Sequence, residues 1–71
     1  MNAEIIFHFQ SLLDGSEGEI KVTNEELEEI LNYHNSEIEY DEDFGGDIFK
    51  IGDNEIVVEK RAGKTILFIN E

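Results

Sequence analysis

A continuous acidic stretch, residues 22–49, places the strongest limit on how this chain can fold. It contains ten carboxylates and neither Lys nor Arg. Ionised carboxylates are almost never fully buried without a partner, so this stretch must lie largely at the surface. We call its acids the acidic belt: Glu25, Glu26, Glu28, Glu29, Glu37, Glu39, Asp41, Glu42, Asp43 and Asp47.

The excess charge is confined to the same part of the chain. Residues 1–49 hold 14 acids and one base, residues 50–71 hold four of each, and the formal net charge is −13. Such a charge leaves many short chains disordered. Here a hydrophobic content of 39%, rich in Ile, Leu and Phe, predicts a folded chain instead. We expect residues 1–71 to form one small acidic domain.

The clearest helix signal begins at Thr23. Thr23 and Glu26 have the spacing of a capping box, in which each residue's side chain accepts a hydrogen bond from the other's backbone amide. Val22 and Leu27 are placed for the accompanying hydrophobic staple. Apolar residues and His34 then recur with helical spacing, and Asn35 can end the helix in a left-handed conformation.

The C-terminal third predicts a three-stranded meander. Residues 48–51, 55–60 and 65–70 have strand-like patterns, separated by turn-like residues 52–54 and 61–63. We expect one face of the last two strands to hold Ile56, Val58, Ile66 and Phe68. Their other face would hold Val57, Leu67 and Ile69, and is too apolar to be left in water.

Two further segments complete the expected sheet. Residues 37–41 alternate acids with Ile38 and Tyr40, which predicts a strand with one acidic and one apolar face, followed by an acidic loop over residues 41–46. Residues 20–22 form a short strand candidate, preceded by a turn over residues 14–19.

Residues 4–13 fit two structures. Ile5, Phe7 and Phe9 would point to one side of a strand, and Ile6, His8 and Gln10 to the other. This alternation and the β-branched and aromatic content favour a strand, which would pair with residues 20–22. The same segment also has a helical stripe, with Asn2 as a cap and Gly15 as its end. The strand is the favoured interpretation.

The expected fold is therefore α+β, with one amphipathic helix packed on a four- or five-stranded antiparallel sheet. Because both faces of this sheet are apolar, something must cover the second face. Either the N-terminal segment covers it as a helix, or a second copy of the chain does so in a homodimer.

No constellation for catalysis stands out, so we expect no enzyme, cofactor or metal. The chain has no Cys, and its two His have no partner at a zinc-ligand spacing. Asp41, Asp43 and Asp47 do not match a calcium-binding loop, because Gly occupies the fifth and twelfth positions. No Ser lies in a context that would activate it as a nucleophile.

The acidic belt instead suggests a protein partner. Carboxylates two residues apart on a strand are separated by about 6.6 Å, close to the spacing of phosphates along a nucleic acid. Such an array would repel nucleic acid and anionic membrane and attract a basic, nucleic-acid-binding protein. Aromatic residues often anchor interfaces, so the expected partner-binding residues are the acidic belt with Tyr33, Tyr40 and Phe44.

The expected function is that of a small acidic inhibitor that imitates nucleic acid. In size, acidity and lack of catalytic features the chain is similar to small phage or bacterial inhibitors of nucleases and defence complexes, an analogy of composition and not of motif. The alternatives are an immunity protein or antitoxin for a basic toxin, and a structural or regulatory subunit that assembles through an apolar sheet face. No secretory signal or membrane-spanning run is recognisable, so we expect a cytoplasmic location.

Overall fold

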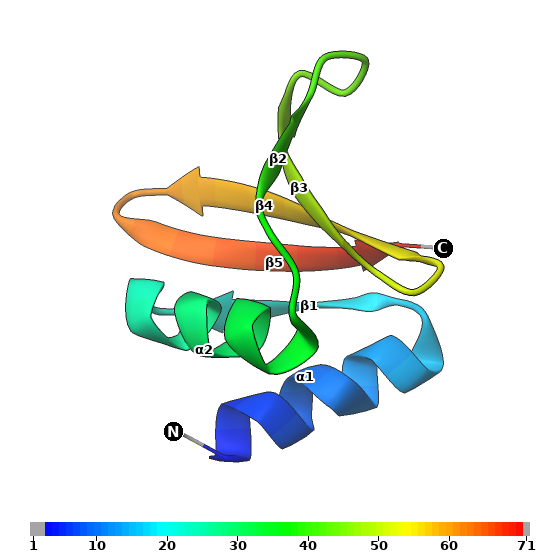
Figure 1. Cartoon of the computed structure of the whole chain (residues 1–71). Helices are drawn as coiled ribbons and strands as arrows, with labels where there is room; N and C mark the ends of the chain where they lie inside the picture. The colour runs from blue at the N-terminus through cyan, green and yellow to red at the C-terminus, as the bar shows by residue number, and fades with distance from the viewer. Residues whose placement is uncertain (1–2, 71) are drawn as a thin grey trace.

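The computed structural model describes residues 3–70, which form two helices and a five-stranded antiparallel sheet (Figure 1). The elements are α1 (Ala3–Gly15), β1 (Gly18–Val22), α2 (Asn24–His34), β2 (Glu39–Asp41), β3 (Gly46–Ile51), β4 (Asn54–Arg61) and β5 (Lys64–Asn70). The strand order is β1-β5-β4-β3-β2. The α+β class and the C-terminal meander of β3, β4 and β5 are thus confirmed.

Helix α2 forms as its sequence predicts. Thr23 Oγ1 accepts a hydrogen bond from the Glu26 amide at 3.1 Å, and Glu26 Oε1 accepts one from the Thr23 amide at 2.8 Å. Val22 and Leu27 are both buried, as a hydrophobic staple requires. Asn35 closes the helix in the left-handed region with φ of 53°.

The expected strand over residues 4–10 is wrong, because this segment is helix α1. Burial of Ile5, Ile6, Phe9 and Leu13 follows the helical stripe. Phe7, which gave the strand pattern its alternation, is 70% exposed. The helix ends at Gly15 as the rival interpretation required, and Asn2 lies outside the described residues.

The expected pairing of β1 with the N-terminal segment is also wrong, because that segment is helix α1. Residues 20–22 do form part of a strand, but β1 pairs with β5 in antiparallel register, with Ile20 opposite Leu67. Gly18 opens this strand with φ of 137°, and a Cβ there would lie 2.8 Å from Leu12 Cδ2 on α1. A side chain at this position would therefore push against the helix.

The faces of β4 and β5 differ from those expected. A two-residue turn, Ala62-Gly63, pairs Arg61 with Lys64, and both turn residues have positive φ. This register places Ile56 opposite Ile69 and Val58 opposite Leu67. Residues paired across strands share a face, so the predicted grouping of Ile56 and Val58 with Ile66 and Phe68 is wrong.

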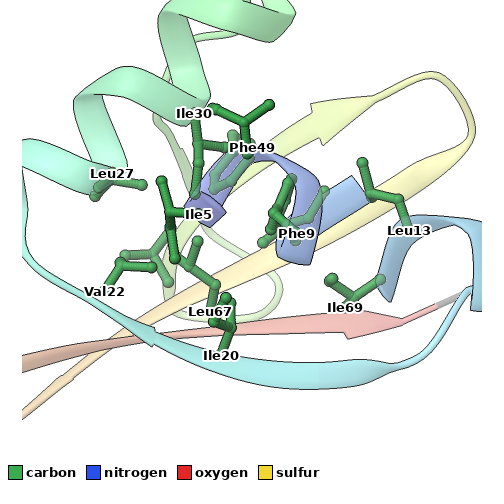
Figure 2. Packing of buried hydrophobic residues seen from close by; sticks show 13 residues of the cluster. Ile5, Phe9, Leu13, Ile20, Val22, Leu27, Ile30, Phe49, Leu67 and Ile69 are labelled. Atoms are coloured by element: carbon green, nitrogen blue, oxygen red, sulfur yellow. The ribbon is translucent and has the colours of Figure 1, made fainter. Parts of the chain in front are cut away.

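The core lies between the two helices and one face of the sheet (Figure 2). Phe9 of α1 is fully buried at its centre, stacked on Phe49 of β3 with ring centroids 6.2 Å apart. Ile30 of α2 and Leu67 of β5 are also fully buried. Burial of these large apolar side chains stabilises the fold against strong charge repulsion.

Strand β2 is shorter than expected, and its predicted apolar face is not buried. It comprises three residues, and Glu37 and Ile38 precede it. Ile38 is 39% and Tyr40 66% exposed. The preceding link is held to the sheet by Ser36, whose Oγ donates a hydrogen bond to the Lys50 carbonyl oxygen at 2.9 Å.

Both helices lie on the same side of the sheet (Figure 1). Helix α1 therefore does not cover the second face, contrary to one of the two expectations. Within residues 3–70, neither helix has the length and apolar character needed to cross a membrane.

Candidate interaction surfaces

The hairpin formed by β2 and β3 projects from the rest of the molecule (Figure 1). Its turn is built by Asp41, whose Oδ1 accepts hydrogen bonds from the amides of Asp43 at 2.9 Å and Phe44 at 3.1 Å. The Asp41 carbonyl oxygen accepts a third, from the Gly45 amide at 2.7 Å. Gly45 has φ of 83°, a conformation that favours glycine. The acidic loop predicted over residues 41–46 is thus an ordered turn.

Four carboxylates of this hairpin are exposed to solvent. They are Glu39, Glu42, Asp43 and Asp47. Asp41 is half-buried, because its side chain holds the turn. The expected array of Glu37, Glu39 and Asp41 along one strand is therefore shorter than predicted, since Glu37 lies outside β2 and Asp41 has a structural role. The hairpin turn adds two exposed carboxylates, those of Glu42 and Asp43, next to Glu39 in the chain.

The remaining helical acids of the belt lie on α2. Glu25 and Glu28 are exposed, and Glu29 is half-buried. Glu26 is half-buried and held in the capping box. The structure thus divides the acidic belt between the helix layer and the edge of the sheet, and two of its members, Glu26 and Asp41, stabilise local structure.

The three aromatic candidates lie in different places. Tyr40, 66% exposed, projects from β2 opposite Asp47. Tyr33, 55% exposed, packs edge-on against His34 with ring centroids 5.0 Å apart. Phe44, 57% exposed, lies in the hairpin turn where two shallow grooves meet. Tyr40 and Phe44 therefore lie on the hairpin with its acids, whereas Tyr33 lies on α2.

His34 lies at the boundary of the core, where its ring is half-buried. Its ring packs edge-on against Phe9 at 5.8 Å, and its Nε2 atom is buried without a hydrogen-bond partner. Desolvation by this burial lowers the pKa of His34. The imidazole is thus part of the core boundary, whereas His8 is exposed on α1.

A face of the sheet that the sequence assigned wrongly is open to solvent. The register places apolar side chains from three strands on it, opposite the helices: Ile48, Val57, Ile66 and Phe68. Ile48, Val57 and Phe68 are direct cross-strand neighbours and form a continuous row. Ile48 is buried, with 3% of its surface exposed, whereas Val57, Ile66 and Phe68 are half-buried. We call this side, away from α1 and α2, the open face.

A groove of about 490 Å³ runs over the open face beside Phe44. Its lining includes Glu17, Val57, Glu59, Arg61 and Phe68. A second groove of about 470 Å³ follows the base of the hairpin, where Tyr40, Asp47 and Lys60 contribute. The two-residue length of the turn at 62–63 was the sequence signal that could have identified this face, because it fixes which side chains share it.

Among residues 3–70, no group of three His, Cys, Asp or Glu side chains is arranged to hold a metal ion. Asp41, Asp43 and Asp47 are therefore not gathered into a cation site, and His8 and His34 are not joined in one. Comparisons of the chain with protein-family models, curated proteins and solved structures found no match.

Proposed function

We propose that this protein is a small acidic inhibitor that acts by binding and not by catalysis. Its partner would be a protein with a basic, nucleic-acid-binding surface, which the acidic hairpin would occupy in place of nucleic acid. The single observation that supports this proposal most is the projecting hairpin (Figure 1), which carries four exposed carboxylates and the exposed ring of Tyr40.

The shape of the hairpin suits a groove that normally holds a nucleic-acid strand. A narrow projection can enter such a groove, whereas a flat acidic surface cannot. Carboxylates at its turn and along β2 would meet Lys and Arg side chains that otherwise contact phosphates. Complementary charge would speed the encounter of the two proteins, and Tyr40 would supply contact area that excludes water.

Charge reversal in the hairpin tests the proposal. The triple variant Glu39→Lys, Glu42→Lys, Asp43→Lys changes exposed residues and retains the Asp41 hydrogen bonds that hold the turn. The immobilised wild-type chain is expected to capture a DNA- or RNA-binding protein from host lysate, with release by salt or by competing nucleic acid. The variant is expected to lose at least roughly 100-fold in affinity for the captured protein, because three attractive contacts become repulsive.

A matched control separates the hairpin from net charge. Glu25→Lys, Glu28→Lys and Glu17→Lys make the same change in charge at exposed positions elsewhere. This control should retain most of the affinity. Equal losses in both triple variants, or capture that nucleic acid does not compete with, would contradict the proposal.

A further inference from the structure

The open face is an apolar surface that neither helix covers, and only Phe44 of the hairpin turn reaches the groove on it. Its central row, Ile48, Val57 and Phe68, crosses three adjacent strands, and Ile66 extends it along β5. An antiparallel sheet that is left open on one side normally has polar residues there.

The charges around this row differ from those of the rest of the chain. Five acids share the open face by register: Glu19, Glu39, Asp41, Glu55 and Glu59. Four of the five bases in the chain lie there too: Lys21, Lys50, Arg61 and Lys64. Five acids against four bases give the strand residues of the open face a net charge of −1, so the remaining −12 of the −13 lies on other residues.

This distribution of charge indicates what kind of molecule binds the open face. A strongly basic partner would be drawn to the surfaces that hold the −12. A second copy of this chain is itself acidic and is repelled by those surfaces. The open face is where two such acidic molecules can approach with the least repulsion. We propose that the open face is a homodimer interface, in which two copies pack sheet against sheet.

The interface is self-complementary in a two-fold arrangement. Arg61 and Lys64 lie side by side at the β4–β5 turn, with Lys21 toward the same end. Glu19 and Glu55 lie toward the other end, where Lys50 is the cross-strand neighbour of Glu55. A two-fold axis across the strands lays the basic end of each copy toward the acidic end of the other. The two sheets would then stack about 10 Å apart, with the Val57 and Phe68 side chains between them.

The homodimer does not depend on the proposed inhibitor function. Of the hairpin residues, Glu39 and Asp41 share the open face by register, whereas Tyr40 and Asp47 face the other side. The helical acids lie beyond the core. A failure of the hairpin variant to lose partner affinity would leave the dimer unaffected. A monomeric chain would equally leave the hairpin proposal unaffected.

Sedimentation equilibrium tests the homodimer directly. At millimolar protein concentration and moderate salt, the wild-type chain is expected to have twice its chain mass of 8.2 kDa. Val57→Lys places a charge at the centre of the open face and is expected to raise the dissociation constant at least roughly 100-fold. Circular dichroism of this variant checks that it remains folded.

A matched pair of surface variants makes the test independent of Val57. Lys64→Glu and Lys60→Glu each change the charge by the same amount near the β4–β5 turn. Lys64 lies on the open face, whereas Lys60 pairs with Thr65 on the opposite side. We expect Lys64→Glu to weaken the dimer about tenfold more than Lys60→Glu.

Three results would overturn the homodimer. The first is a wild-type chain that stays monomeric at millimolar concentration in moderate salt. The second is a dimer that a folded Val57→Lys variant retains. The third is equal weakening by Lys60→Glu and Lys64→Glu, which would assign association to another surface, such as the strand edges at β1 and β2.

Discussion

At the scale of single residues, His34 makes the stability of the folded chain depend on pH. Its pKa is lowered in the folded chain by desolvation, and its buried Nε2 atom has no hydrogen-bond partner. The unfolded chain, with a pKa of about 6.5 for this side chain, binds the proton more readily. The neutral imidazole therefore favours folding above pH 6.5, and this contribution is lost as the pH falls from 6.5 toward the lowered folded pKa.

Replacement of the ring isolates this effect. His34→Phe keeps an aromatic side chain against Phe9 and Tyr33 but does not titrate. We expect the melting temperature of the wild-type chain to fall relative to that of the variant between pH 7.5 and 5. The difference between the two proteins cancels the contribution of the carboxylates. A difference that stays constant over this range would show that His34 titrates alike in the folded and unfolded chain.

Two acids show how a residue's role depends on what its side chain contacts. Glu26 and Asp41 belong to the acidic belt by sequence, but each carboxylate accepts backbone hydrogen bonds. The capping-box spacing predicted this role for Glu26. For Asp41 the side chain bonds its own turn, a common use of Asp that a search for charge patterns overlooks. Reversal of these two charges would therefore change the fold as well as the surface.

At the scale of elements, the capping box of α2 gives a direct prediction. Thr23→Ala removes the hydroxyl that accepts from the Glu26 amide at 3.1 Å. We expect a loss of about 1 kcal/mol in the free energy of unfolding, or a fall of roughly 4–8 °C in melting temperature for a domain of this size. Thr23→Ser keeps the hydroxyl and is expected to lose less than half as much. Equal losses in urea denaturation would mean that the cap does not stabilise the folded chain.

Elements with local signals were predictable, and those decided by tertiary contacts were not. Both ends of α2 are specified by residues within a few positions of each end, namely Thr23, Glu26 and Asn35. Helix α1 has two valid apolar patterns, and the choice depends on Phe9 packing against Phe49 and His34, which are distant in sequence. The strand pattern counted Phe7 as a core residue, although it is exposed.

The open face was misassigned for a different reason. The strands β4 and β5 were recognised, but a turn taken as three residues shifts the pairing by one position. In a strand each one-residue shift moves every side chain to the other face. The positive φ values of Ala62 and Gly63 define a two-residue turn. A strand over residues 37–41 and an acidic loop over residues 41–46 were predicted, but the projection of the resulting hairpin from the body depends on tertiary structure.

At the scale of the whole molecule, the fold separates charge by side. The helices and the hairpin carry most of the acidic residues, whereas four of the five bases share the open face. An ion pair joins Arg61 Nε and Glu59 Oε1 at 2.6 Å, and both side chains are partly exposed. Exposed pairs contribute little, so this pair offsets little of the repulsion among the acids.

This imbalance predicts that salt stabilises the protein. Two carboxylates 6.6 Å apart repel by about 0.6 kcal/mol in water, and ions screen such repulsion over about 10 Å at 0.1 M. We expect the free energy of unfolding to rise by about 1 kcal/mol between low and moderate NaCl, or roughly 4–8 °C in melting temperature. Salt would also strengthen a homodimer. The melting temperature is therefore measured against NaCl at two protein concentrations, with the Val57→Lys variant as a monomeric reference. A melting temperature that is independent of salt in this reference would mean that self-repulsion does not limit folding.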